Sequence, residues 1–142
     1  MSKIAVIGSG TMGNGIAHLF AQHGHDVALI DVSAPALEKA KGTIAANLER
    51  QVKKGTLAAE APAEILARIS TGTDLAGAAS ASLVIEAASE NPAIKFDIFA
   101  KLDALCAPET ILASNTSSIS ITEIAAKTKR ASQVIGMHFM NP

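Results

Sequence analysis

The sequence contains no tryptophan, no tyrosine, one cysteine, and no long run of apolar or basic residues. The single cysteine, Cys106, permits neither an intrachain disulfide nor a cysteine-based zinc site, and we expect a buried, unreactive thiol. No apolar stretch approaches the roughly 20 residues that cross a bilayer, so no membrane helix is expected. Lys and Arg number 12 against 13 Asp and Glu, and this balance excludes the basic surface that nucleic-acid binding needs.

The length of 142 residues and a hydrophobic content of 49% suit one globular domain with a buried core. Residues 3–8 already have the character of a strand. They lack the longer apolar stretch and the cleavage site of a signal peptide. We therefore expect a cytoplasmic protein.

Short apolar runs alternate with segments of helical periodicity along the whole chain. Strands are predicted at 3–8, 26–31, 69–71, 81–89, 110–114 and 132–139, and helices at 11–24, 34–55, 61–69, 91–107 and 120–128. Asn91 followed by Pro92 is a helix start signal, and Ser120 with Glu123 forms a capping box. Alternating strands and helices indicate a parallel sheet with right-handed crossovers. The sequence predicts one doubly wound α/β domain over residues 1–142.

The segment GSGTMG at residues 8–13 matches the G-x-G-x-x-G pattern between a strand and a helix. In this context the pattern is typical of a dinucleotide-binding, Rossmann-like fold. Gly8 allows the tight turn, Gly10 lets the backbone approach a pyrophosphate, and Gly13 lets helix and strand pack closely. Thr11 and Met12 open the helix, whose free N–H groups attract phosphate. A purely structural turn is the alternative.

Asp31 closes the second predicted strand, 18 residues beyond Gly13. A carboxylate at this position accepts hydrogen bonds from the adenosine ribose and would repel a 2′-phosphate. No Arg or Lys follows before Lys39, so NAD is favoured over NADP as the cofactor. The alternative role for Asp31 is a favourable charge before the next helix.

Polar side chains follow three successive strand ends, the edge where open α/β sheets bind ligands. Glu90 and Lys95 follow the strand at 81–89, Asn115 and Ser117 the strand at 110–114, and His138 lies at the end of the last strand. Each could be a helix cap or a structural residue, but three such ends favour a site. The remaining histidines are expected on the surface or in packing; they are His18, His23 and His25.

Absent residue types narrow the choice of oxidoreductase. The lack of tyrosine excludes a tyrosine-based short-chain dehydrogenase within this chain, and one cysteine excludes the usual zinc alcohol dehydrogenase site. Four segments, GSGTMGNGIA, VIEAASEN, ASNTSS and GMHFMNP, resemble the N-terminal domain of the L-3-hydroxyacyl-CoA dehydrogenases, in particular the 3-hydroxybutyryl-CoA type.

The resemblance implies NAD-dependent oxidation of L-3-hydroxyacyl-CoA to 3-ketoacyl-CoA, or the reverse reduction, in fatty acid and butanoate metabolism. It implies that the family's catalytic glutamate and helical C-terminal domain, which forms a homodimer, would lie beyond Pro142. On this expectation the isolated chain binds NAD(H) without turning over acetoacetyl-CoA. Two alternatives stay open: a stand-alone NAD-binding or redox-sensing module, and a β-hydroxyacid dehydrogenase of the 6-phosphogluconate type, which uses a catalytic lysine.

The resemblance also implies residue roles. His138 would be the general base that takes the 3-hydroxyl proton, a task that suits imidazole near neutral pH. Ser117 and Asn141 would hold the reacting oxygen and orient the histidine region. Asn115, Glu90 and Lys95, all named above, would contact the nicotinamide ribose and ring side.

A candidate CoA surface lies on the long helix predicted at 34–55. Asn47, Arg50 and Lys54 share one helical face, and the family binds CoA phosphates near this helix. The resemblance makes Asn47 and Lys54 candidate CoA contacts. An ordinary solvated helix face is the alternative.

Overall fold

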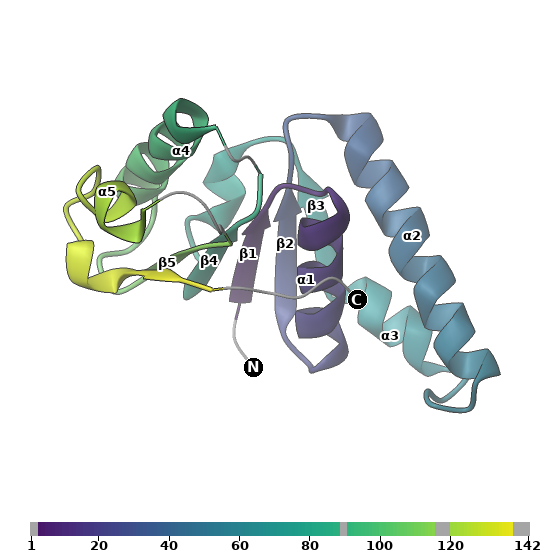
Figure 1. Cartoon of the computed structure of the whole chain (residues 1–142). Coiled ribbons are helices and arrows are strands. Elements are labelled where there is room, and N and C mark those ends of the chain that lie inside the picture. The colour runs from purple at the N-terminus through teal and green to yellow at the C-terminus, as the bar shows by residue number, and fades with distance from the viewer. Residues whose placement is uncertain (1–2, 89–90, 116–119, 138–142) are drawn as a thin grey trace.

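A computed structural model describes residues 3–88, 91–115 and 120–137 (Figure 1). The described strands form one six-stranded sheet in the order β3-β2-β1-β4-β5-β6, and every neighbouring pair is parallel. The strands are β1 Lys3–Ile7, β2 Asp26–Ile30, β3 Ile69–Gly72, β4 Leu83–Glu86, β5 Ile111–Ser114 and β6 Val134–Gly136. The predicted doubly wound α/β fold is confirmed.

Five α-helices and two short 3₁₀ turns connect these strands in the described ranges. They are α1 Thr11–Gln22, α2 Ala34–Lys53, α3 Ala61–Ala67, η1 Leu75–Ala78, α4 Pro92–Leu105, α5 Ile121–Ala125 and η2 Ala131–Gln133. The expected caps are present, since Asn91 accepts from the Ile94 amide and Ser120 from the Glu123 amide. None of the helices in the described ranges has the length and apolarity needed to cross a bilayer.

Several elements are shorter than predicted, for local reasons. The helix predicted to reach residue 128 ends at Ala125. Beyond it the backbone hydrogen bonds span three residues instead of four, from Lys127 N to Ile124 O and from Thr128 N to Ala125 O. Strand β6 begins at Val134 because the preceding residues form η2. Strand β4 ends at Glu86. Its carboxylate accepts a hydrogen bond from the Ala88 amide, and the chain turns there.

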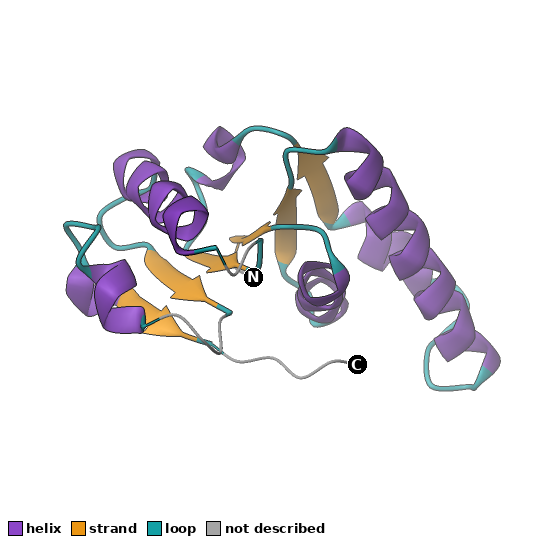
Figure 2. Ribbon diagram, turned by 45° about the horizontal axis from the view of Figure 1, so that its top comes forward, coloured by secondary structure: helices purple, strands orange, loops and turns teal. Residues whose placement is uncertain are grey.

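Alternate residues of the strands face two separate cores, as the period of two requires. Val6 and Leu29 belong to the core under α1, α2 and α3, whereas Ile7 and Ile30 belong to the core under η1, α4 and α5. The two sets of helices therefore cover opposite faces of the sheet (Figure 2).

The strand order reverses at β1, which lies between β2 and β4. Ile7 is in register with both Ile30 and Glu86, Glu86 pairs with Ser114, and Ser114 pairs with Gly136. The carboxyl ends of these five strands therefore line up along one edge. A reversal of this kind opens a crevice at that edge, where α/β folds bind ligands.

Arg130 stabilises the opposite end of the sheet. Its guanidinium donates to the carbonyl oxygens of Asp103, Cys106, Ala107 and Thr110, and its Nε donates to the Asp103 carboxylate at 2.6 Å. The side chain thus satisfies carbonyls at and beyond the C-terminus of α4 that the helix leaves unpaired. Cys106 is buried there, and burial raises the pKa of its thiol, as expected for an unreactive cysteine.

Candidate functional site

The glycine loop joins β1 to α1, and its three glycines have different surroundings. Gly8 has a φ of +103°, which lets the chain turn sharply at the end of β1. A Cβ atom on Gly13 would lie 1.8 Å from the carbonyl oxygen of Gly8, so α1 begins in direct contact with the loop. A Cβ on Gly10 would meet no atom within 4 Å, which leaves that backbone open to a ligand. These geometries support the predicted division of roles.

The first turn of α1 presents free backbone amides at the same edge. Gly10 is the N-cap and supplies no side-chain cap, and no acidic residue lies in the first turn. Thr11 is exposed and Met12 is half-buried. Uncapped amides at the positive end of a helix favour an anion, so this turn suits the pyrophosphate of a dinucleotide.

Asp31 directly follows β2 and binds the glycine loop. Its Oδ2 accepts from the Ser9 amide at 2.9 Å and from Ser9 Oγ at 2.7 Å, and its Oδ1 accepts from the Ser33 amide at 3.0 Å. Burial alone would raise the pKa of this carboxyl, but the hydrogen bonds from Ser33 and Ser9 outweigh it and hold the pKa below its ordinary value. Asp31 is therefore a carboxylate at neutral pH and also positions the loop.

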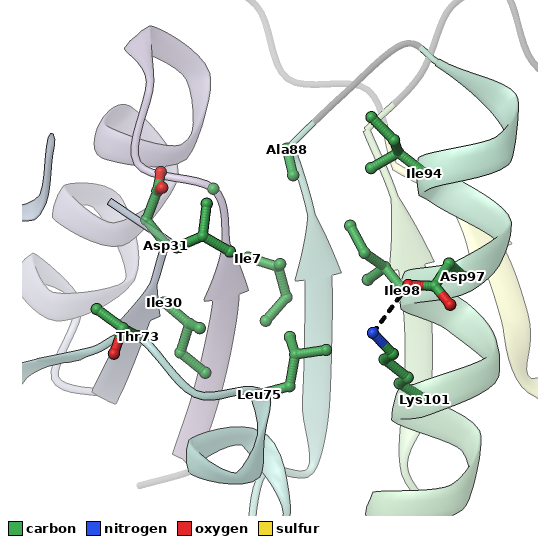
Figure 3. A pocket seen from close by; sticks show the side chains of 12 residues that line it. Ile7, Ile30, Asp31, Thr73, Leu75, Ala88, Ile94, Asp97, Ile98 and Lys101 are labelled. Atoms are coloured by element: carbon green, nitrogen blue, oxygen red, sulfur yellow. Dashed lines mark ion pairs between the residues drawn. The ribbon is translucent and has the colours of Figure 1, made fainter. Parts of the chain in front are cut away.

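An apolar cavity of about 410 Å³ lies beside Asp31 (Figure 3). Ile94 and Ile98 of α4 line one side, and the carboxylate of Asp31 lies on the other. Val32, which also lines the cavity, is 93% exposed, and Ile94 is 50% exposed. Exposed apolar walls beside a carboxylate that is predicted to bind the ribose suit a flat ring such as adenine.

A buried charged cluster lies at the carboxyl ends of β4 and β5. Lys95, near the start of α4, forms an ion pair with Glu86 and donates to Ser114 Oγ at 3.1 Å. All three residues have no exposed surface. The amide of Asn115 donates to the carbonyl oxygen of Glu86 at 2.8 Å. Lys95 is thus beneath the edge rather than on its surface, and its contact with cofactor stays a prediction.

A polar groove of about 510 Å³ separates α1 from α2. Asn47, Arg50 and Lys54 all line it, and Arg50 donates to Asn47 Oδ1 at 2.9 Å. His18 and Gln51 line it too. The Oε1 atom of Gln51 is buried without a hydrogen-bond partner among the described residues. The predicted face is therefore the wall of a groove with two cations, which suits an anionic ligand.

A third cavity, of about 530 Å³, connects the other two above the glycine loop. It shares Asp31 and Ala88 with the apolar cavity, and Asn14 and Asn47 with the polar groove. Lys39 also lines it. One continuous surface therefore runs from the apolar cavity across the glycine loop to Lys54.

Four predicted site residues lie outside the described residues: Glu90, Ser117, His138 and Asn141. Of their sequence neighbours, Asn115 follows β5 and Met137 follows β6. The Met137 amide donates to the carbonyl oxygen of Ser114 at 3.0 Å, so these two strand ends are adjacent.

Comparison with protein-family models matches residues 3–142 to the NAD-binding domain of 3-hydroxyacyl-CoA dehydrogenase. The chain belongs to this family. The predicted cofactor is thereby supported: this is an NAD-binding domain.

Curated relatives and a solved structure agree with this assignment. The chain is 52% identical over its whole length to 3-hydroxyadipyl-CoA dehydrogenase of Escherichia coli, and covers 30% of that protein. It is 50% identical over 99% of its length to 3-hydroxybutyryl-CoA dehydrogenase of Clostridioides difficile, and covers 50% of it. The crystal structure of (S)-3-hydroxybutyryl-CoA dehydrogenase from Ralstonia eutropha superimposes with a TM-score of 0.96 at 44% identity, over the whole chain and 50% of that structure. The chain spans half or less of the length of these family members.

Sequence reasoning missed several residues of the site. Ser9 holds Asp31, and only its place inside the glycine loop hinted at a role. Glu86 carried a clearer signal, because an acid at the end of an otherwise apolar strand needs a partner. Gln51 and His18 carried no signal in the sequence, because the groove that they line exists only once α1 and α2 pack together.

Proposed function

We propose that this chain is the NAD-binding part of an enzyme that interconverts L-3-hydroxyacyl-CoA and 3-ketoacyl-CoA. The observation that carries the substrate assignment is the polar groove between α1 and α2, which contains two cations. This groove is continuous with the cavity above the glycine loop. Arg50 and Lys54 would attract the CoA phosphates, and Asn47 would add a hydrogen bond. An acyl-CoA in this groove would have its phosphates near α2 and its thioester free to extend toward the cofactor.

In the proposed reaction, His138 takes the proton from the 3-hydroxyl group as the hydride leaves C3. NAD, when bound, would accept this hydride. Ser117 and Asn141 hold the reacting oxygen and orient the histidine region. The adjacent ends of β5 and β6 support this proposal, because these residues follow those strands within five residues in the sequence. Glu90 and Asn115 contact the nicotinamide side, and Lys95 lies buried beneath this edge.

The family assignment and the names of the relatives favour this function over the two alternatives. A redox sensor or a 6-phosphogluconate-type dehydrogenase would need no CoA groove. The names of the relatives give two candidate substrates within the acyl-CoA class, 3-hydroxybutyryl-CoA and 3-hydroxyadipyl-CoA. Assembly as a homodimer stays a prediction that rests on the family resemblance. A cytoplasmic location stays a prediction that rests on the N-terminal sequence.

The groove is tested by acetoacetyl-CoA binding. Lys54→Ala should raise the Kd for acetoacetyl-CoA about three- to tenfold, the loss expected for one exposed charge opposite a phosphate. Calorimetry on the NADH-loaded chain measures this, and the Kd for NADH should not change. Lys53→Ala is the matched control, because Lys53 is also exposed but does not line the groove. Equal effects of both substitutions would reject the groove as the CoA site.

Cofactor selectivity is tested at Asp31. The chain should bind NADH well and NADPH poorly, because the Asp31 carboxylate would face the 2′-phosphate. Asp31→Asn removes the charge and keeps an acceptor for Ser9. It should therefore reduce the preference for NADH over NADPH about tenfold or more, mainly by tighter NADPH binding. Calorimetry with both nucleotides measures the ratio. Equal affinities in the unmodified chain would contradict the assignment of Asp31.

A further inference from the structure

Lys39 lies on the face of α2 that borders the cavity above the glycine loop. The residues of α2 that line this cavity recur every three or four positions, as one side of a helix does; they are Ala36, Lys39, Ala40, Thr43 and Asn47. The two alanines beside Lys39 on this face are too short to shield its side chain from the cavity. Lys39 is exposed, and its ammonium has no hydrogen-bond or ion-pair partner in the described ranges. This cation is therefore available to a ligand in the cavity.

Asp31 brings the opposite charge to the same cavity. Its carboxylate is held in place by the Ser9 hydroxyl and by the amides of Ser9 and Ser33. No ion pair joins it to Lys39 in the part of the chain that the structure describes. The cavity thus has a fixed anion and a flexible cation that do not neutralise each other.

The two charges border the place where the adenosine ribose is expected. The ribose joins the adenine ring, which suits the apolar cavity, to the pyrophosphate, which suits the glycine loop. Asp31 lines both the apolar cavity and the cavity above the loop. A ribose bound to Asp31 would therefore lie where these two cavities meet, with Lys39 on the wall of the second.

NADP differs from NAD by one phosphate on the 2′ oxygen of this ribose. Asp31 would repel that phosphate. Lys39 is eight residues beyond Asp31 in the sequence, but the first turns of α2 place it on the wall of a cavity that Asp31 also lines. An ammonium on a flexible four-carbon stem can move toward a phosphate there, so the two side chains act on it in opposite directions.

We propose that Lys39 is a second determinant of nucleotide choice, which attracts the 2′-phosphate of NADPH and limits the preference for NADH that Asp31 produces. The proposal rests on the adenosine ribose lying at Asp31. The preference for NADH is then a difference between two opposed charges. Removal of Lys39 sharpens this preference, whereas removal of the Asp31 charge leaves the attraction by Lys39 unopposed.

The experiment measures the ratio of the Kd for NADPH to the Kd for NADH, by calorimetry on the 142-residue chain. Lys39→Met should raise this ratio about three- to tenfold through weaker NADPH binding, the factor expected for one exposed charge near a phosphate. The Kd for NADH should stay within about twofold. Lys39→Arg keeps the charge and should leave the ratio within about twofold of the unmodified chain.

The same substitution is repeated in the Asp31→Asn variant, which binds NADPH more tightly. There Lys39→Met should again raise the ratio about three- to tenfold, because the phosphate is no longer repelled from the cavity. This arm gives a result even where NADPH binds the unmodified chain too weakly to measure. Higher ionic strength should diminish the effect of Lys39 in both backgrounds, since exposed charges are screened by salt.

Lys41→Met is the matched control. Lys41 is an exposed lysine of the same helix, and it lines none of the three cavities described above. Its replacement changes the net charge of the chain as Lys39→Met does, but it should leave the ratio within about twofold of the unmodified chain. A shift as large as that of Lys39→Met would show that net charge, and not the position of Lys39, controls the ratio, and would overturn the proposal.

The role of Lys39 is also rejected if Lys39→Met leaves the ratio within twofold in both backgrounds, or weakens NADH and NADPH by the same factor. In the second case Lys39 binds a group that the two nucleotides share, such as the pyrophosphate. If Asp31→Asn itself leaves the ratio unchanged, the ribose does not lie at Asp31. The assay contains no acyl-CoA, so its outcome is independent of the proposed substrate.

Discussion

Gly13→Ala should lower the free energy of unfolding by about 3 kcal/mol or more, at the upper end of what overpacking costs. The added Cβ would lie 1.8 Å from the carbonyl oxygen of Gly8 and 2.7 Å from its carbonyl carbon, and both are backbone atoms that no rotamer change can move. Relief requires α1 to shift away from β1, which would also displace the phosphate-binding turn. Urea denaturation measures the loss, and the Kd for NADH should rise more than tenfold in any variant that folds.

Gly10→Ala in the same loop is the matched control. Its Cβ would meet no protein atom, and Gly10 has a φ of −68°, which alanine adopts readily. Its unfolding free energy should therefore stay within about 1 kcal/mol of the unmodified chain. NADH binding should still weaken about tenfold, because the methyl group occupies the approach of the pyrophosphate. If Gly10→Ala binds NADH normally, the pyrophosphate does not approach the backbone at Gly10. If Gly13→Ala is as stable as the parent, the packing argument is wrong.

In an enzyme that contains this chain and has the proposed activity, His138→Gln should reduce turnover about 10²–10⁴-fold, while the Kd for NADH stays within about twofold. Glutamine keeps the size and polarity of the side chain but cannot accept the hydroxyl proton as a base. NADH consumption with acetoacetyl-CoA measures turnover, and calorimetry measures binding.

His23→Gln is the control for His138→Gln. His23 is exposed at the end of α1 and lines none of the three cavities described above. Its replacement should leave both turnover and NADH affinity unchanged. If His138→Gln retains turnover within a few-fold of the parent, His138 is not the general base and has a structural role instead.

Much of the candidate site could be predicted because its signals are local. Gly8, Gly10 and Gly13 are recognisable from spacing, because each answers a requirement of one turn between one strand and one helix. Asp31 is recognisable because it ends the next strand, and parallel strands place their carboxyl ends at one edge. Asn47 and Lys54 are recognisable as one helical face, but whether that face was a groove or open surface depended on the packing of α1.

The sequence by itself determined the alternation of strands and helices, the parallel sheet, the glycine loop and the acid after β2, since periodicity and turn chemistry act over a few neighbouring residues. Only the tertiary structure decided the partners of polar side chains. Lys95 belongs with Glu86 and Ser114 because β4, β5 and α4 meet there, and residues 9, 19 and 28 positions apart become neighbours. Ser9 likewise reaches Asp31 across 22 positions. A polar group accepts any partner that geometry brings within hydrogen-bond distance, so its pairing is fixed by the assembled sheet and not by the local pattern.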